Sequence, residues 1–149
     1  MKNTKSYIKE IIKKFNKNKV NYILIGRQAV VLYGLPVTSF DYDFWIRPTD
    51  REKTFNILLE ENFEPSSALK DKKPIVFFIK DIHKIDVFFV NGFGNLLFDE
   101  CFKRATIFKE KDFSLRVASA EDLIKLKNFR KEKTQKDKED IKFLKLLKK

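Results

Sequence analysis

Apolar residues recur along this chain with two different spacings, which predict helices and strands in turn. From Tyr7 to Phe15 they fall three or four positions apart with Lys between them, which predicts an amphipathic helix over residues 4–18. The next apolar run, Val20–Ile25, is short and rich in branched side chains, so it predicts a buried strand that ends at Gly26. A short helix over residues 27–33 is expected to follow.

The rest of the chain predicts an alternation of strands and helices that later gives way to hairpins. An aromatic strand is expected over residues 41–47, and Thr49 or Asp50 can cap the helix that runs from there to about residue 62. The remaining expected elements are a polar loop at 65–73, a hairpin of strands 75–80 and 84–90 around Asp81-Ile82-His83, a turn at 91–94, a short helix at 96–103, strands at 106–109 and 113–117, and helices at about 120–130 and 135–147 capped by Ser119 and Thr134. This order favours an α/β (α+β) fold, a mixed β-sheet with helices packed on it.

Length and composition are those of one folded domain. The 149 residues leave little room for a second domain, and 43% hydrophobic residues with sixteen Phe supply a core. We therefore expect a single domain over residues 1–149 with basic amphipathic helices at both ends. The longest apolar runs are too short to cross a bilayer, and no apolar segment of a signal peptide follows the basic start at residues 1–5. These features predict a cytoplasmic protein without a membrane partner.

Cysteine and histidine are too scarce for two classes of site. The one Cys, Cys101, excludes an internal disulfide and suits a reducing cytosol, and with one His it also excludes a Cys/His zinc site within one chain. A metal ion would have to be held by oxygen ligands, which points to magnesium or a similar hard ion. Cys101 and Trp45 are expected to pack in the core, whereas His83 is expected on the surface.

The net charge of +11 lies at the two ends of the chain. Residues 1–20 carry a net +6 and residues 121–149 a net +5, whereas residues 21–120 hold fourteen basic and fourteen acidic side chains. A basic patch attracts polyphosphates or nucleic acid. A Lys-rich composition that only keeps the helices soluble explains the same excess, so the charge by itself leaves both interpretations open.

Two carboxylates interrupt the aromatic strand predicted at residues 41–47. Asp41 and Asp43 are two positions apart, so on a strand both side chains point to the same face. Two like charges among aromatic neighbours repel each other and cost desolvation, and a cation bound by both would relieve this. A pair of exposed Asp on an edge strand is the alternative, but Asp is depleted in strands, which favours the cation.

A third carboxylate, Asp86, interrupts the apolar strand predicted at residues 84–90. If the two strands are neighbours, three carboxylates converge, and such a cluster can hold metal ions that clamp the attacking and leaving oxygens of a phosphoryl displacement. Asp86 can also accept the proton of an attacking hydroxyl, and a salt bridge to a Lys is its alternative role. The order of strand, Gly26 and helix offers backbone N–H groups to a phosphate, although one Gly after a strand is usually just a turn.

Together these segments resemble the nucleotidyltransferase fold shared by polymerase-beta-like enzymes. The signature of that superfamily is a hydrophobic residue and Gly, a spacer, Asp-x-Asp and later a lone Asp in a strand. It is matched here by Ile25-Gly26, Asp41-Tyr42-Asp43 and Ile85-Asp86-Val87. The stretch from Glu121 to Ile141 is similar to the tail of the toxin–antitoxin-associated, AbiEii-like branch, in which a Lys followed by an Arg or Lys with Asp ends the domain. The resemblance spans about residues 20–144.

The resemblance implies transfer of a nucleoside monophosphate from a nucleoside triphosphate to an acceptor hydroxyl, with Mg²⁺ or Mn²⁺ as the metal. Asp137 and Asp140 are expected to be structural or to cap the tail. The site residues that the resemblance implies are Asp41, Asp43 and Asp86 for metal binding and catalysis, and Gly26, Arg27 and Lys127 for the triphosphate.

Arg27 departs from the superfamily pattern, which usually has Gly or Ser at this position. Its guanidinium would supply positive charge to the triphosphate, obstruct it, or pair with Asp41 or Asp43 in place of a metal. Val37 also departs from the pattern, since related proteins often carry Arg there. For Lys127, an ordinary solvated helical Lys is the alternative to a phosphate ligand.

Two functions follow from these features. The leading one is a small nucleotidyltransferase of a toxin–antitoxin or phage-defence system. Its acceptor is an RNA end such as that of tRNA, a protein hydroxyl or a small molecule, and its partner is a cognate toxin or antitoxin. The alternative is a catalytically weak relative that binds RNA or a protein through its basic ends, which Arg27 favours and the three carboxylates oppose. An ordinary RNA-binding domain is a third interpretation, which no RRM, KH or zinc signature supports.

Overall fold

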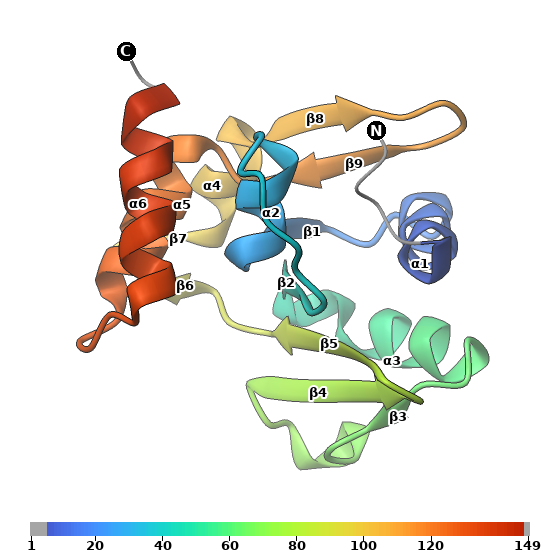
Figure 1. Cartoon of the computed structure of the whole chain (residues 1–149). Coiled ribbons are helices and arrows are strands. Elements are labelled where there is room, and N and C mark those ends of the chain that lie inside the picture. The colour runs from blue at the N-terminus through green and yellow to red at the C-terminus, as the bar shows by residue number, and fades with distance from the viewer. Residues whose placement is uncertain (1–5, 148–149) are drawn as a thin grey trace.

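Short strands make up the centre of the molecule in the computed structural model, which describes residues 6–147. They are β1 (Tyr22–Ile25), β2 (Tyr42–Ile46), β3 (Glu64–Pro65), β4 (Ile75–Lys80), β5 (His83–Phe88), β6 (Gly92–Phe93), β7 (Leu96–Leu97), β8 (Thr106–Lys109) and β9 (Ser114–Val117). Seven of them form one sheet in the order β3-β4-β5-β2-β1-β9-β8, and β6 and β7 form a separate hairpin (Figure 1). β1 runs antiparallel to β2 and parallel to β9, and β2 runs parallel to β5, so the sheet is mixed, as the sequence predicts.

Helices cover the two faces of this sheet unequally (Figure 1). They are α1 (Ser6–Lys17), α2 (Gly26–Leu32), α3 (Arg51–Glu60), α4 (Phe98–Arg104), α5 (Ala120–Phe129) and α6 (Gln135–Leu147), with single 3₁₀ turns at Pro48–Asp50 and Leu69–Asp71. α1 and α3 contact each other on one face, where Phe15 packs edge-on against Phe44 and Phe55 against Phe78. α2 packs on β1 and β2, and α5 and α6 pack against α2. Alternate residues of β4 are exposed.

Trp45 and Cys101 lie in the core, as the sequence predicts. Both are fully buried, and Trp45 Nε1 donates a hydrogen bond to the Val90 carbonyl at 2.8 Å, which satisfies its polar group. Burial raises the pKa of the Cys101 thiol to about 12, which keeps it protonated and unreactive. Within residues 6–147, no helix is both long and apolar enough to pass through a bilayer.

The helices lie close to their predicted positions, and two predicted caps are present. At the start of α5, Ser119 Oγ accepts a hydrogen bond from the backbone N–H of Asp122 at 3.1 Å. At the start of α6, Thr134 Oγ1 accepts from the Asp137 N–H at 3.1 Å, and the Asp137 carboxylate accepts from the Thr134 N–H at 3.0 Å. These reciprocal bonds form a capping box, which fixes where α6 begins relative to α5.

Other local predictions are wrong. Asp50 does not cap α3, because its carboxylate accepts two hydrogen bonds at 2.8 Å from the backbone and side-chain nitrogens of Asn21. His83 is not in the turn of the hairpin: it opens β5 and its half-buried ring stacks on Tyr7 with centroids 4.0 Å apart. The strands β3, β6 and β7 were not predicted, because two residues are too few to show a period. The start at residues 1–5, where no signal peptide is expected, lies outside the described residues.

Candidate active site

The site begins at a close approach between the turn at Gly26, where β1 passes into α2, and Asp43 on β2. The antiparallel register pairs Ile25 with Asp43, which brings the turn against this carboxylate. Gly26 has a φ of +77°, in the left-handed region that favours glycine. A Cβ atom on Gly26 would overlap Oδ2 of Asp43 and lie 3.0 Å from its Cγ. Only glycine therefore lets the carboxylate lie against the backbone of the turn.

Asp43 and Asp86 are direct neighbours across the parallel strands β2 and β5. The pKa of Asp43 is raised to about 7, chiefly by burial and then by the charge of Asp86 and a hydrogen bond between the two carboxyl groups. Asp86 Oδ1 is buried and makes no hydrogen bond, although Lys84 Nζ lies 3.5 Å away. The sequence left two roles open for Asp86, a place in a carboxylate cluster and a salt bridge to a Lys. The structure is compatible with both, since Asp86 lies beside a second carboxylate and near a Lys. A bound cation would relieve the repulsion that now raises the pKa of Asp43.

Asp41 lies just outside this pair. The predicted strand is one residue too long at this end: β1 ends at Ile25 opposite Asp43, and β2 begins at Tyr42, which pairs with Ile85 of β5. Asp41 is exposed in the preceding loop, yet its charge contributes to the raised pKa of Asp43. Across residues 6–147, no three His, Cys, Asp or Glu side chains are already grouped to hold a metal ion. Asp41 would have to turn toward Asp43 and Asp86 to complete such a group.

A cavity of about 430 Å³ lies beside Asp43, between the Gly26 turn and helices α5 and α6. Part of its wall is aromatic and consists of Phe88, Phe93 and Phe129. The rest is charged, and its ionisable lining residues are Arg27, Asp43, Lys127, Arg130, Lys136, Asp137 and Asp140. The cavity has the size of a small-molecule site and joins cationic groups to an aromatic surface.

Lys127 is buried in this cavity, which excludes the alternative of an ordinary solvated Lys. The residue is 8% exposed, and its Nζ lies 2.9 Å from Asp140 Oδ2 and 3.7 Å from Asp137 Oδ1. Asp140 is itself fully buried, and its other carboxylate oxygen lies 3.4 Å from Nη1 of Arg27. One buried carboxylate thus faces two cations from two different helices, which offsets the cost of burying each charge.

Arg27 points toward α6 and does not pair with Asp41 or Asp43. Its Nη2 lies 3.2 Å from Glu139 Oε1, in addition to the contact of Nη1 with Asp140. The side chain is 18% exposed and lines the same cavity as Lys127. The two cations that the sequence assigns to a triphosphate are therefore together, and both are held by carboxylates of α6.

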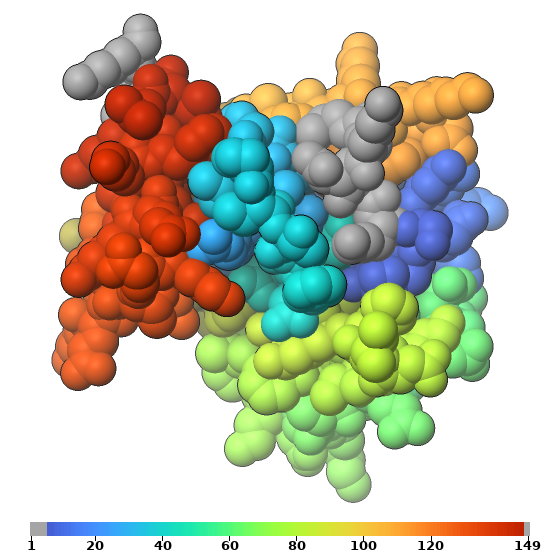
Figure 2. Space-filling model, in the orientation of Figure 1, coloured from blue at the N-terminus to red at the C-terminus, as the bar shows by residue number. Residues whose placement is uncertain are grey.

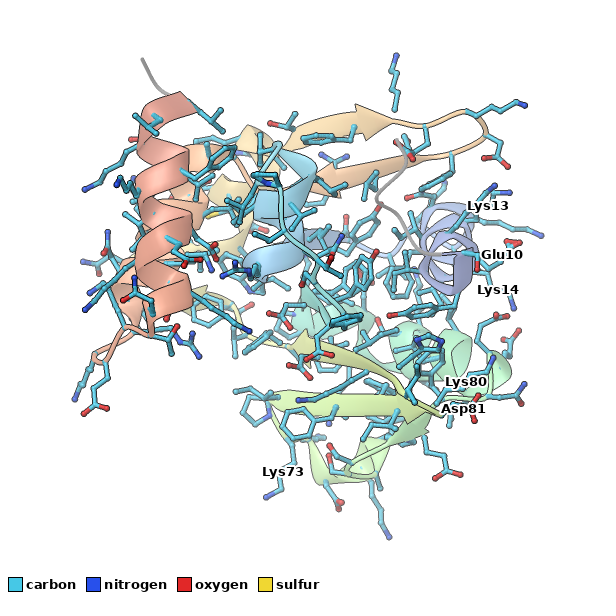
Figure 3. All side chains as sticks on the ribbon, in the orientation of Figure 1. Glu10, Lys13, Lys14, Lys73, Lys80 and Asp81 are labelled. Atoms are coloured by element: carbon cyan, nitrogen blue, oxygen red, sulfur yellow. The ribbon has the colours of Figure 1, made fainter. Side chains whose placement is uncertain are left out.

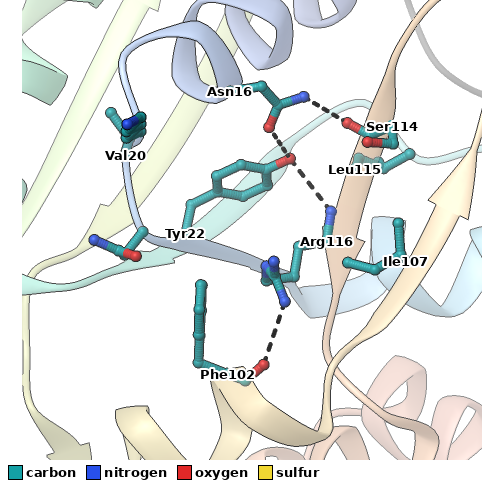
Figure 4. A pocket seen from close by; sticks show the side chains of 10 residues that line it. Asn16, Val20, Tyr22, Phe102, Ile107, Ser114, Leu115 and Arg116 are labelled. Atoms are coloured by element: carbon teal, nitrogen blue, oxygen red, sulfur yellow. Dashed lines mark hydrogen bonds between the residues drawn. The ribbon is translucent and has the colours of Figure 1, made fainter.

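A second cavity, of about 230 Å³, lies beside Tyr22 and Arg116 (Figure 4). Its central polar groups are already paired: the Tyr22 hydroxyl donates to Asn16 Oδ1 at 3.1 Å and accepts from the Arg116 N–H at 3.2 Å. Asn16 Nδ2 in turn donates to the Ser114 carbonyl at 2.7 Å. Since no sequence-predicted site residue lines this cavity, the candidate active site is the one at Gly26 and Asp43.

Comparison with solved structures identifies the fold around this site. The lincosamide antibiotic adenylyltransferase LnuA, in a lincomycin-bound crystal structure, is similar with a TM-score of 0.72 and 22% identity, over 95% of this chain and 96% of its own. The antibiotic-resistance factor ANT(2'')-Ia gives 0.68 and 11% identity, over 97% of this chain and 83% of its own. A candidate nucleotidyltransferase from Thermotoga maritima, TM1012, gives 0.61 and 18% identity, over 80% and 79%. This chain has the nucleotidyltransferase fold.

The sequence motifs predict the nucleotidyltransferase fold, and the comparison of backbone structures confirms this prediction. No family model matches this sequence, and no curated protein does either. The identities of 11 to 22% are too low to carry an activity from a neighbour to this chain. The AbiEii-like branch within the superfamily stays a prediction from the sequence.

Asp140 has the structural role expected of it, but the sequence did not reveal which residues it contacts. Asp137 has the expected structural role, since it caps α6 and lies 3.0 Å from Arg130 Nη1. Asp140 is buried between Arg27 and Lys127. One signal was available, because residues 137, 140 and 144 fall on one helical face and the last is an apolar Leu. A carboxylate on the apolar face of a helix indicates a buried partner.

Proposed function

We propose that this chain is a nucleotidyltransferase that moves a nucleoside monophosphate from a nucleoside triphosphate to a hydroxyl group with the help of a divalent metal ion. The observation that carries the proposal is the close approach of the Gly26 turn to Asp43, with Asp86 beside it and a cation-lined cavity next to both. Phosphoryl transfer requires chiefly positioning and charge neutralisation, and this arrangement offers groups for each.

The carboxylates of Asp43 and Asp86 fit a hard divalent ion such as Mg²⁺ or Mn²⁺. Asp86 Oδ1 is buried without a hydrogen bond, and the pKa of Asp43 is raised by burial and by its neighbour's charge. Both features fit oxygen atoms that can act as ligands of a cation. With Asp41 as a further ligand, the ion would neutralise charge on the reacting phosphate and on its leaving group.

Arg27 and Lys127 would bind the triphosphate beside the Gly26 turn. Both line the cavity, and both are paired with α6 carboxylates that a triphosphate would have to replace, above all Asp140. The aromatic wall around Phe93 would then pack against the nucleobase, because every base presents an apolar face.

Asp86 would accept the proton of the acceptor hydroxyl. The hydroxyl oxygen forms a bond to the α-phosphorus while the bond from that phosphorus to the bridging oxygen breaks, and pyrophosphate leaves. Asp86 lies beside Asp43 but is not among the residues that line the nucleotide cavity, so an acceptor bound at Asp86 would not have to displace the nucleotide.

The similar solved structures and the sequence suggest different classes of acceptor. One neighbour is a lincosamide adenylyltransferase with lincomycin bound and another is an antibiotic-resistance factor, which supports a small molecule as the acceptor. An RNA end such as that of tRNA, or a protein hydroxyl, follows instead from the AbiEii-like resemblance. A toxin–antitoxin or phage-defence setting, with a cognate toxin or antitoxin as partner, stays a prediction from that resemblance.

A catalytically weak, nucleotidyltransferase-like binding module is the second candidate. The ion pairs of Arg27 and Lys127 with α6 favour it, because in such a protein these pairs would stay closed while the basic ends bind RNA or a protein. The Asp43–Asp86 pair favours the enzyme, since two adjacent, partly buried carboxylates are costly unless they bind a cation.

Transfer of radioactive phosphate tests the proposal. The purified chain is incubated with each α-³²P-labelled nucleoside triphosphate and Mg²⁺, together with either total RNA or the small-molecule fraction of a cell extract. We expect a labelled product that requires Mg²⁺ and is lost in Asp43→Asn. The matched control Asp81→Asn, in the exposed β4–β5 turn, should keep the activity. Nucleotide binding without any transferred label would support the binding module instead.

A further inference from the structure

The part of the sheet beyond Asp86 presents an apolar face that is open to solvent. Along β4, Ile75, Phe77 and Ile79 are 47%, 41% and 47% exposed, while the residues between them are buried. Figure 2 shows the surface of this segment, in yellow-green, with no helix in front of it. We call these three side chains the β4 face. Exposed apolar side chains in a row are typical of a binding surface.

The β4 face lies beside the two carboxylates of the candidate active site, in the same row of neighbouring side chains across the sheet. The strand register pairs Asp43 with Asp86, and Asp86 with Phe77. Neighbouring strands lie about 4.8 Å apart, so Phe77 is one strand beyond Asp86. Lys84 Nζ lies 3.5 Å from Asp86 Oδ1 and 4.4 Å from the centre of the Phe77 ring, which places both side chains on the same face of the sheet.

The direction of attack assigns this side of the site to the acceptor, if the proposed function holds. In phosphoryl transfer the attacking and leaving oxygens lie roughly in line on opposite sides of the phosphorus. The leaving pyrophosphate would lie toward the Gly26 turn and Lys127, on the cavity side of Asp43. The attacking hydroxyl must then approach from the side of Asp86, and the body of the acceptor extends over Phe77.

The charge of this region indicates which acceptor fits. Residues 64–88 hold five Lys and four acidic residues, a net +1, whereas the two ends of the chain carry +6 and +5. Figure 3 shows Lys73 and the Lys80–Asp81 turn at opposite ends of β4, away from its apolar middle. A nucleic acid would need a continuous basic track beside the site. The β4 face instead matches an apolar surface, because the Lys84 charge beside Phe77 is balanced by Asp86.

We propose that the β4 face binds the apolar body of a small, uncharged molecule whose hydroxyl group is the acceptor. The hydroxyl oxygen bonds to the α-phosphorus, its proton passes to the carboxylate of Asp86, and the bond to the bridging oxygen breaks to release pyrophosphate. Phe77, next to Asp86 in the row, contacts the part of the acceptor closest to the reacting hydroxyl and selects for apolar character there.

Methyl NMR of the full chain, labelled at isoleucine, tests this assignment. Hexyl glucoside serves as a neutral probe with hydroxyls and an apolar chain, and glucose as its matched control without that chain. We expect hexyl glucoside to shift the signals of Ile75 and Ile79 but not that of Ile107, which is 43% exposed on β8. Glucose should shift none of them. Ile25, which lines the nucleotide cavity, reports separately on a non-hydrolysable magnesium–triphosphate complex.

Variants and a second ligand complete the test. Phe77→Ser should weaken hexyl glucoside binding roughly tenfold and leave the nucleotide response of Ile25 unchanged, while Ile107→Ser changes neither. The assignment is overturned if hexyl glucoside leaves Ile75 and Ile79 unmoved, or if an RNA oligonucleotide moves them instead. It is also overturned if they shift with protein concentration alone, because a second copy then covers the face. Loss of the Ile25 response would overturn the proposed function instead.

Discussion

At the scale of single residues, the site is governed by two neighbouring carboxylates. Asp43 and Asp86 lie opposite each other on parallel strands, and the Gly26 backbone closes one side of Asp43. Burial and the charge of Asp86 together raise the pKa of Asp43 to about 7. The carboxylate is therefore partly protonated at neutral pH when no metal ion is bound, and a metal ion and a proton compete for it.

Asp43→Asn is expected to make the metal-free protein more stable at pH 8. The pKa of Asp43 is about 7 in the folded chain and 3.8 when unperturbed, so wild type loses stability as the pH rises from about 4 to about 7. Asn does not ionise, and above pH 7 the difference in unfolding free energy is of the order of 4 kcal/mol, whereas below pH 4 it vanishes. Thermal unfolding in EDTA at both ends of this range measures it. Equal stabilities at pH 8 would contradict the raised pKa.

Gly26→Ala is expected to abolish binding of a magnesium–triphosphate complex, whereas Gly34→Ala is expected to keep it. Both glycines have positive φ, +77° and +118°, so either substitution strains the backbone by roughly 1 kcal/mol. Only at Gly26 would the new Cβ displace Asp43, because at Gly34 the nearest heavy atom is Phe143 Cζ at 3.6 Å. Calorimetric titration compares the two, and equal affinities would remove the Gly26 turn from the site.

At the scale of elements, α6 closes the cavity and supplies its counter-charges. The capping box at Thr134 and Asp137 sets the start of the helix, and Asp140, one turn later, reaches both Arg27 and Lys127. Three helices that are separate in the sequence, α2, α5 and α6, are thereby joined through one buried carboxylate. An incoming triphosphate would compete with this carboxylate for the same two cations.

Asp140→Asn is expected to lower the melting temperature of the free protein, because Arg27 and Lys127 lose their shared buried partner. A magnesium–triphosphate complex would supply the missing negative charge, so it should raise the melting temperature of the variant more than that of wild type. Glu139→Gln removes a partner of Arg27 whose side chain is 51% exposed, and it should change both values little. If the nucleotide stabilises Asp140→Asn less than wild type, Asp140 positions the cations and does not compete with the ligand.

The elements themselves could be predicted from the sequence to a large extent. β4 has the predicted bounds, and α6 begins at the predicted residue, because its cap is visible in the sequence. Asp43 and Asp86 could be singled out because a carboxylate in an apolar strand is unusual. Gly26 could be identified as well, since it separates a strand from a helix.

The rest of the site depends on contacts between distant parts of the chain. Arg27 and its partner Glu139 are 112 residues apart, and no local period reveals such a pair. The burial of Asp140 depends on how α6 packs against α2 and α5, so its sequence context alone suggested a structural role. Asp41 was placed on the strand because its neighbours are aromatic, but β2 begins one residue later, at Tyr42, which pairs with Ile85 of β5.

At the scale of the whole molecule, the row from Asp43 to Phe77 divides the surface into two sides. The cavity with its cations lies on one side, and the apolar β4 face lies on the other. The neighbours LnuA and ANT(2'')-Ia match 95% and 97% of this chain, so the nucleotidyltransferase fold accounts for nearly all of it. The basic C-terminal end contributes Lys127, Arg130 and Lys136 to the cavity side.

RNA binding through the basic ends is expected to be non-specific and sensitive to salt. The net charges of +6 and +5 at the two ends attract phosphates, and such binding weakens about tenfold or more between 50 and 200 mM salt. Asp43→Asn should leave it unchanged, because the contacts with the RNA phosphates are made by Lys and Arg side chains. Filter binding with total RNA measures both, and salt-resistant binding lost in Asp43→Asn would place RNA in the active site.

The central claim is that Asp43, Asp86 and the Gly26 turn together bind a metal–triphosphate complex. Anomalous scattering from crystals of the full chain, grown with Mn²⁺ and a non-hydrolysable nucleoside triphosphate, tests it most directly. The account predicts an anomalous peak coordinated by the carboxylates of Asp43 and Asp86, with the phosphates at the Gly26 turn and beside Lys127. A metal ion bound elsewhere, or a triphosphate that avoids the Gly26 turn in the presence of that ion, would contradict it.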